Sequence, residues 1–313
     1  MDWFAPGSKG AGRKARRLPA GAFVLALLAV LGRVSGFALS VGGQVYDWNV
    51  IGRFVMPGET LSLALPNSGS PGWAVSAGHL IQVGSSRVDW VAPQEPGLYP
   101  IAVTSGAALA TVNVLVKAPY DNLKRGRLNG YRIGRYPKTN PFPSFMVPDG
   151  FIEVTEDNID TRVSPRYTLR EFVSRQPGKF PKYLVLQEEL VLKLELLTDL
   201  VQSKGHPCDR LTVFSGYRTP AFQSDRGAGK HSAHSYGGAA DIYVDSNGDE
   251  RMDDLNGDGL SGSRDAKLLA SYVDELEARH PWLVGGCGWY RSTRSFGAFV
   301  HTDTRGEAMR WHR

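Results

Sequence analysis

The residues best suited to chemistry lie in two short runs of the C-terminal half, one around His234 and one around His301. In the first run, His234 precedes a Gly237-Gly238 turn, and Asp241 follows inside an expected strand. Such a turn can fold the imidazole and the carboxylate toward one point, and His301 can add a second imidazole. Three protein ligands, with a fourth position left for water, form the pattern of a catalytic zinc site.

The spacing alone leaves two interpretations open, because isolated pairs of histidine and aspartate are common in proteins. Either His234 and Asp241 are ordinary surface residues, or they bind a metal together with His301. In the second case the metal would lower the pKa of its bound water to about 7, as in zinc hydrolases.

Four motifs in a fixed order favour the metal site. They are S-G-Y-R at 215–218, S-x-H-x-x-G-x-A-x-D at 232–241, G-G-C-G-W-Y at 285–290 and H-x-D-x-R-G at 301–306. Over roughly residues 165–313 this arrangement resembles the zinc D-alanyl-D-alanine carboxypeptidase superfamily. That superfamily also contains peptidoglycan endopeptidases, phage endolysins and the Hedgehog signalling domain.

The resemblance implies that His234, Asp241 and His301 bind a catalytic Zn²⁺ ion. It also implies that Arg218 holds the carbonyl or carboxylate of the substrate, a role that suits a planar guanidinium with a fixed charge. The implied activity is hydrolysis of peptide bonds next to D-alanine in peptidoglycan stem peptides, by either carboxypeptidase or endopeptidase cleavage.

One departure from the family pattern concerns the general base. Many members carry an acid three residues before the last histidine, where this chain has Ala298, and others carry a histidine two residues before it, where this chain has Phe299. The nearest acid is Asp303, which can act as the base or can orient His301 by accepting a hydrogen bond. The alternative function is a catalytically inactive cell-wall-binding protein that retains the peptidase fold.

A second motif, between the two histidine runs, has the spacing of a calcium-binding loop. Residues 254–265 match the D-x-N-x-D-G opening of EF-hand and dockerin loops, with an acid at the twelfth position. The expected ligands of a structural Ca²⁺ ion are Asp254, Asn256, Asp258 and Asp265, with the carbonyl of Leu260. A polar surface turn is the alternative. A similar run from Asp245 carries Glu250 where glycine is expected, so it is the weaker match.

The elements expected around these motifs are of mixed α and β type. A stripe of apolar residues at helical spacing, from Leu186 to Val201, ends before Gly205 and predicts a core helix. A second helix is expected between Asp265 and Pro281. Strands are expected at 211–215, at 240–244 and from 299 into the last histidine. The fold class predicted for this half is an α+β zinc peptidase domain.

The preceding part of the chain has the pattern of β structure. Leucines alternate with small or polar residues at 61–65, and valines do the same at 112–116. Clusters of turn-forming residues at 57–58, 67–72 and 96–97 separate the apolar runs. We therefore expect a small all-β immunoglobulin-like sandwich without the usual cysteines before the peptidase domain.

The N-terminus has the composition of a leader. Five basic residues and one acidic residue lie within the first seventeen positions, and an uncharged apolar run follows from Ala20 to Leu31. This is the pattern of a secretory signal peptide, and an uncleaved membrane anchor is the alternative. Either would place the mature chain in the periplasm or elsewhere outside the cytoplasm.

The expected organisation has four parts. They are a signal peptide or N-terminal anchor at 1–36, a β-sandwich domain at 37–117, a proline-rich basic linker at 118–165 and a zinc D-Ala-D-Ala peptidase-like domain at 166–313. The basic face of the linker is either a solvated surface or a contact for an anionic cell-wall polymer.

Composition excludes several classes of protein. The hydrophobic fraction of 42% excludes a disordered chain. The formal charge is +5, but most of it lies in the leader, so a nucleic-acid-binding function is not expected. Two cysteines are too few for a disulfide framework or a cysteine-built zinc module. Cys208 and Cys287 can either pair in an oxidising compartment or remain as buried thiols.

Overall fold

The structure is a computed structural model that describes residues 38–65 and 71–313. The segment expected to be a signal peptide or anchor, residues 1–36, lies outside the described residues. Within the described ranges, no helix combines the length and the apolar character needed to cross a bilayer.

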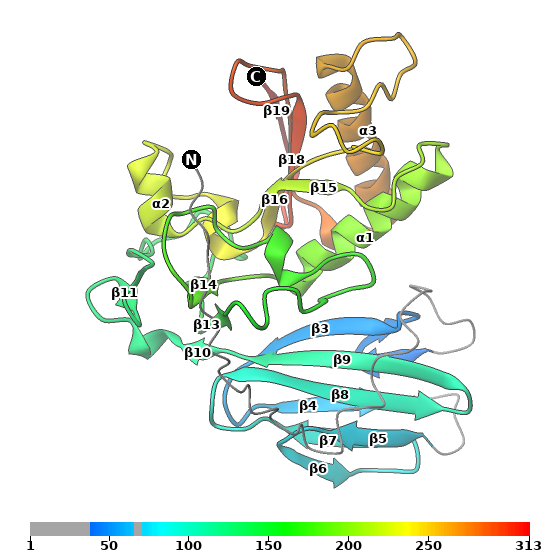
Figure 1. The fold of residues 1–313 in the computed structure, drawn as a ribbon, viewed down its shortest axis with the longest axis vertical. Helices are drawn as coiled ribbons and strands as arrows, with labels where there is room; N and C mark the ends of the chain where they lie inside the picture. Colours follow the sequence, from blue (N-terminus) through cyan, green and yellow to red (C-terminus); the bar gives the residue numbers. More distant parts are fainter. Residues whose placement is uncertain (1–37, 66–70) are drawn as a thin grey trace, which may run out of the picture. The chain divides into compact units, whose positions relative to one another are not determined.

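Two β-sheets that share one core form the first part of the described chain (Figure 1). Their strands are β1 (Leu39–Val41), β2 (Gln44–Tyr46), β3 (Val50–Val55), β4 (Thr60–Ala64), β5 (Gly72–Val75), β6 (His79–Gln82), β7 (Arg87–Val91), β8 (Gly97–Ser105) and β9 (Ala108–Val116). The strand orders are β2-β1-β4-β7-β6 and β3-β9-β8-β5. Leu63 and Trp90 of one sheet and Ile101 and Val112 of the other are buried in the common core. The alternating patterns predicted for 61–65 and 112–116 are therefore confirmed as strands.

Residues 118–165, which were expected to be a linker, instead contain strands and a 3₁₀ turn. These elements are β10 (Ala118–Pro119), the 3₁₀ turn η1 (Tyr120–Asn122), β11 (Arg127–Leu128), β12 (Tyr131–Arg132) and β13 (Gly150–Val154). β13 pairs antiparallel with β14 (Lys182–Leu184), which lies well beyond the expected linker. The reason is that Tyr136, Phe145 and Phe151 lie among the prolines of this segment and are buried in a core that they share with Tyr183 and Tyr236.

The remaining elements build an α+β unit with more strands than helices. They are η2 (Leu169–Glu171), α1 (Glu188–Ser203), β15 (Thr212–Ser215), α2 (Pro220–Asp225), η3 (Ala233–Tyr236), β16 (Ala239–Tyr243), α3 (Ser263–Arg279), η4 (Pro281–Leu283), β17 (Gly286–Tyr290), β18 (Phe299–Asp303) and β19 (Met309–His312). The main sheet has the order β15-β16-β18-β17-β19. Both predicted helices and the three predicted strands are confirmed to within three residues, and β19 is an addition.

Helix packing determines which face of the main sheet is free for a site. Leu190, Leu194 and Val201 of α1 are buried, as the stripe predicts, together with Leu269 of α3 and Val300 of β18. Because side chains alternate along a strand, Val300 faces the helices and its neighbour His301 faces the opposite side. β16 pairs antiparallel with β18 and places Asp241 directly opposite His301. The sheet therefore presents both residues on the face away from α3.

The N-terminal sheets are joined to the C-terminal unit by polar contacts. Arg53 of β3 is 8% exposed, pairs with Glu188 at the start of α1 and donates to the Val41 carbonyl at 2.6 Å. The backbone N–H of Phe54 donates to the same Glu188 carboxylate at 3.2 Å. The described residues accordingly belong to one compact unit.

Candidate metal centre

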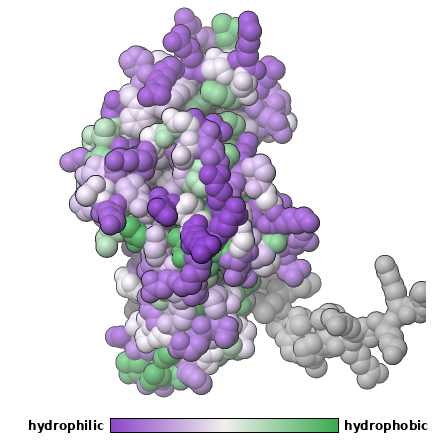
Figure 2. Space-filling view, turned by 90° about the vertical axis from the view of Figure 1, so that its left-hand side faces the viewer, coloured by the Kyte–Doolittle hydropathy of each residue, from purple (hydrophilic) through white to green (hydrophobic). Residues whose placement is uncertain are grey.

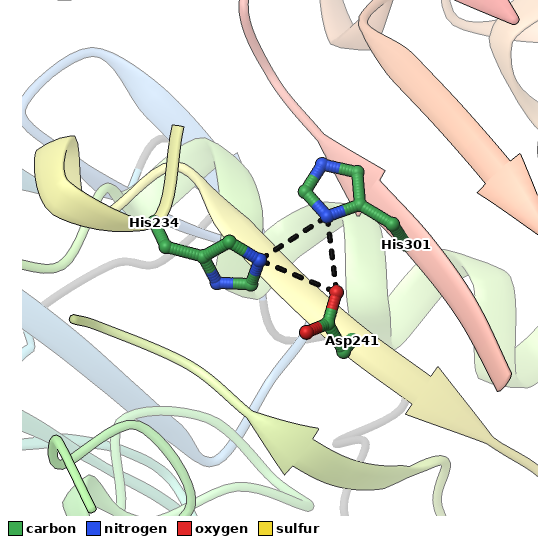
Figure 3. A group of neighbouring side chains, drawn as sticks. All are labelled: His234, Asp241 and His301. Carbon is green, nitrogen blue, oxygen red and sulfur yellow. Dashed lines mark hydrogen bonds and ion pairs between the residues drawn. The ribbon is translucent and has the colours of Figure 1, made fainter. Parts of the chain in front are cut away.

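Three side chains from separate elements meet on the free face of the main sheet (Figure 3). They are His234 of η3, Asp241 of β16 and His301 of β18. His234 Nε2 lies 3.2 Å from His301 Nδ1, and Asp241 Oδ1 lies 3.2 Å from the first nitrogen and 3.0 Å from the second. The exposed fractions of the three residues are 2%, 4% and 7%, so the group is shielded from bulk water.

A glycine lets η3 turn into β16. Gly237 has a φ of +71°, and a Cβ there would lie 2.4 Å from the carbonyl oxygen of Val185. Any side chain would therefore clash with the backbone as well as strain the left-handed conformation. The turn brings His234 back over the strand that carries Asp241, as its spacing in the sequence predicts.

Hydrogen bonds on the outer side of each imidazole determine which nitrogen faces the centre. The Nδ1–H of His234 donates to the Gly216 carbonyl at 2.7 Å. The Nε2–H of His301 donates to Asp303 at 2.9 Å. In its neutral form each ring therefore turns a nitrogen lone pair toward the centre, which is the arrangement of metal-binding histidines.

The donor set and its dimensions fit a zinc ion. At Zn–N and Zn–O distances of about 2.0–2.1 Å, tetrahedral ligand atoms lie about 3.3–3.4 Å apart. The observed separations of 3.0–3.2 Å are close to that value. Two nitrogen lone pairs and a carboxylate that face one another also favour a cation between them. Among the described residues, this is the one group of three or more His, Cys, Asp or Glu side chains whose ligand atoms all lie within 4.8 Å.

The electrostatics of the group follow from burial and from these contacts. Burial lowers the pKa of His234 and outweighs the nearby Asp241 carboxylate, so the neutral imidazole is favoured. Burial also acts to lower the pKa of His301, but hydrogen bonds to Asp241 and Asp303 raise it overall. Burial acts to raise the pKa of Asp241, but the two histidines hold it well below its ordinary value. Asp241 is therefore a carboxylate at neutral pH, as a ligand must be.

Arg218 lies beside the group, in the loop between β15 and α2. Its Nε–H donates to the Ser215 hydroxyl at 2.8 Å, and its Nη2 pairs with the outer oxygen of Asp241. The side chain is 18% exposed, and within the described part of the chain its Nη1 has no hydrogen-bond acceptor. Arg218 therefore orients Asp241 and still has a donor to offer.

Asp303 lies on the far side of the His301 ring and is fully buried. Its Oδ2 accepts from His301, its Oδ1 accepts from the Gly286 N–H at 2.7 Å, and Arg305 pairs with it. Burial acts to raise the pKa of this carboxyl, but the bonds from His301 and Arg305 lower it overall. Both oxygens are occupied by donors and face away from the centre. The geometry favours the orienting role over the role of general base.

The Asp303→Asn variant separates these two roles. The loss of the charged acceptor for His301 is expected to weaken zinc binding about 10–100-fold. Competition with a chromogenic chelator measures this, with the exposed Glu307→Gln as the matched control. Unchanged zinc affinity with lost hydrolysis would instead identify Asp303 as the base.

A buried lysine donates a hydrogen bond to the backbone carbonyl of Asp303. The sequence did not predict this contact. Lys193 of α1 is 0% exposed, and its Nζ donates to Glu277 at 2.6 Å, to the Leu283 carbonyl at 2.9 Å and to the Asp303 carbonyl at 2.7 Å. All three ammonium protons thus have acceptors. Lys193 joins α1, α3 and the end of β18, and so fixes the backbone that carries His301 and Asp303.

Trp311 of the unpredicted strand β19 is a further neighbour of the centre. Its ring centroid lies 5.2 Å from that of His301, and its Nε1–H donates to the Tyr290 hydroxyl at 2.8 Å. A Cβ on Gly288 would lie 2.2 Å from the indole, so the glycine lets the ring lie across β17. In the sequence, the feature that could have indicated this contact is the tryptophan close to the end of the chain.

The expected calcium loop is closed by its own hydrogen bonds. Asp254 accepts from the N–H groups of Gly257 and Gly259, and Asp258 pairs with Arg264 at 2.9 Å. Asp265 is fully buried, and its carboxylate accepts from the N–H groups of Leu255, Asn256 and Gly262. Asp265 therefore caps the N-terminus of α3. Within the described ranges the loop acids do not form a second group with ligand atoms inside 4.8 Å, so calcium binding stays a prediction.

Melting curves test the calcium prediction. At about 1 mM calcium and a Kd of about 10⁻⁴–10⁻³ M, binding to the folded state would add about 0.4–1.4 kcal/mol and raise the melting temperature by about 1–4 °C. Asp258→Ala should remove the difference between calcium and a calcium-selective chelator. Coincident midpoints for the unmodified protein would show that the loop is only a polar turn.

The two cysteines are free and buried rather than paired. Burial raises the pKa of Cys208 to about 11 and that of Cys287 to about 12. Of the two alternatives left open by the sequence, the structure has the buried thiols, and their raised pKa values keep both in the unreactive thiol form at neutral pH.

Comparisons with known proteins add little to this geometry. No protein-family model matches the chain, and no curated protein matches it. A solved structure of the LD transpeptidase LdtMt1 in complex with imipenem aligns at 16% identity with a TM-score of 0.16. The alignment covers 20% of this chain and 35% of that chain, so about a third of that protein's length is spanned. A likeness of this size says nothing about the fold or activity of this chain.

Proposed function

We propose that this chain is a zinc-dependent peptidase that hydrolyses peptide bonds next to D-alanine in peptidoglycan stem peptides. The observation that carries the proposal is the buried triangle of His234, Asp241 and His301, whose donor atoms and spacings fit zinc. The D-alanine substrate depends on the four sequence motifs and on the superfamily that they resemble.

The finer fold and the compartment belong to the same proposal. Residues 166–313 would have the zinc peptidase fold, and the two N-terminal sheets would be a sandwich of immunoglobulin type. The leader would send the protein out of the cytoplasm, to the periplasm or to a membrane-anchored position on its outer side. Peptidoglycan peptides would be the partners, with no role for nucleic acid.

The residues around the centre have distinct tasks in this proposal. When bound, zinc supplies Lewis acidity, which polarises a peptide carbonyl and acidifies water. Arg218 directs its unpaired Nη1–H at the carbonyl or terminal carboxylate of the substrate, where its charge stabilises developing negative charge. Asp303 holds His301 in the tautomer whose Nδ1 is free to bind.

A second candidate function is a catalytically inactive cell-wall-binding protein. One observation favours it: both carboxylates near the centre are committed to other partners, Asp241 to Arg218 and Asp303 to Arg305 and His301. With Ala298 in the place of the usual acid, such a protein would keep zinc and the fold without turnover.

Digestion of purified muropeptides by zinc-loaded protein decides between the two functions. A carboxypeptidase shortens pentapeptide stems by one D-alanine, and an endopeptidase converts cross-linked dimers to monomers. Both products are identified by mass, with Asp241→Ala as the inactive control. Bound zinc with no product from either substrate would contradict the enzyme and support the wall-binding protein.

A further inference from the structure

A basic surface projects from the segment that was expected to be a linker. It consists of Arg125, Arg127, Arg132 and Arg135, all exposed, on and beside the β11–β12 hairpin. We call it the arginine surface. Figure 2 faces the side of the molecule on which β11 lies in Figure 1, and hydrophilic side chains cover most of that side.

The arginine surface is hollowed rather than flat. One hollow of about 450 Å³ is lined by Arg127, Arg132 and Lys179, among others. A second of about 480 Å³ is lined by all four arginines. Because Arg127 and Arg132 line both hollows, the two adjoin and form a continuous concave strip.

Most of the positive charge on this strip is not neutralised by the protein. Arg132 pairs with Asp225 at 2.5 Å, whereas Arg125, Arg127 and Arg135 make no ion pair within the described residues. Arg125 also has a φ of +51°, a backbone conformation that residues other than glycine rarely adopt. The unpaired guanidinium groups are therefore available to anionic ligands.

The β11–β12 hairpin is followed by a loop that is hydrogen-bonded to α2, the helix that follows Arg218. The N–H of Ala221 in α2 donates to the carbonyl of Ile133 at 3.0 Å, and α2 begins two residues after Arg218. A Cβ on Gly134 would lie 2.5 Å from the Ala221 nitrogen, so the loop and the helix are in close contact. The arginine surface therefore adjoins the loop that carries the proposed substrate-binding arginine.

We propose that the arginine surface binds polymeric peptidoglycan, through the carboxylates of stem peptides next to the one in the candidate metal centre. This inference rests on the proposed function. Guanidinium groups bind carboxylates through paired hydrogen bonds, and stem peptides repeat free carboxylates along each glycan strand. A membrane fits less well, because no large hydrophobic side chain is exposed between residues 118 and 138 to enter a bilayer.

Co-sedimentation with insoluble peptidoglycan tests the inference. The triple variant Arg125→Gln, Arg127→Gln, Arg135→Gln is expected to bind about tenfold more weakly at low ionic strength, which is the combined effect of three exposed ion pairs. A matched variant with the same change in net charge, Arg251→Gln, Lys267→Gln, Arg313→Gln, should bind like the unmodified protein. Replacement of the three surface arginines by lysine should restore much of the binding, and an unchanged melting temperature shows that each variant folds.

Hydrolysis separates this inference from the proposed function. On a soluble muropeptide with a single stem, the arginine variant should retain the full rate, whereas on insoluble peptidoglycan its rate should fall about as much as its binding. If no substrate is hydrolysed, the peptidase proposal fails while the sedimentation result still stands. Equal binding of the two triple variants overturns the inference. The inference is also overturned if the arginine variant loses binding to phosphatidylglycerol vesicles but not to peptidoglycan, because that result would identify a membrane-binding surface.

Discussion

Alanine in place of His234, Asp241 or His301 is expected to remove zinc and peptidase activity together. Each substitution leaves two protein ligands, and two ligands do not hold zinc against dialysis. The loss of activity should exceed the roughly 10–100-fold effect of removing an outer hydrogen-bond partner. Metal analysis of dialysed protein, paired with the rate of muropeptide digestion, measures both quantities on the same sample.

His231→Ala is the matched control for these variants. His231 lies three residues before His234 but does not belong to the triangle of ligand atoms. This variant should keep one zinc per chain and its activity. A variant of Asp241 or His301 that still holds one equivalent of zinc would show that the triangle is not the metal site.

Among the variants considered, Lys193→Ala is expected to lower the free energy of unfolding the most. Its Nζ is buried with three acceptors, and its removal leaves the Oε1 atom of the nearly buried Glu277 without its charged partner. Breaking such a pair costs about 3–5 kcal/mol. The lower end is expected here, because Arg310 still pairs with the other oxygen of Glu277.

Urea denaturation measures the effect of Lys193→Ala on the free energy of unfolding. Lys267→Ala, on the exposed side of α3, is the control and should change stability by no more than about 0.5 kcal/mol. If Lys193→Ala unfolds at the urea concentration of the unmodified protein, the buried ammonium does not hold these elements together.

The sequence predicted the parts of the fold that have a clear period. The apolar stripe of α1 follows from the burial of one face of that helix. The strands that carry Asp241 and His301 are buried along their whole length, and their short apolar runs indicated them instead. The two glycines after His234 indicated a tight turn, and Gly237 adopts the left-handed conformation that such a turn needs. The turn reverses the chain between His234 and Asp241, so the sequence indicated that these two residues could approach each other.

Other features depend on contacts between distant parts of the chain. Lys193 looks like a solvent-facing residue within a leucine-rich helix, and only the approach of Glu277 and Asp303 makes its burial possible. The short strand β19 is mostly exposed, so it has no apolar alternation to reveal it. The position of Asp303 behind His301 could not be read from the H-x-D spacing, which is the same for a base and for an orienting acceptor.

Removal and return of zinc tests the central proposal most directly. Protein stripped with a zinc chelator is digested against purified muropeptides, before and after one equivalent of zinc is added back, and the products are identified by mass. We expect no product from the zinc-free protein, and we expect D-alanine release or cross-link cleavage to recover once zinc is restored. Full activity in protein shown to be free of zinc would contradict the proposal.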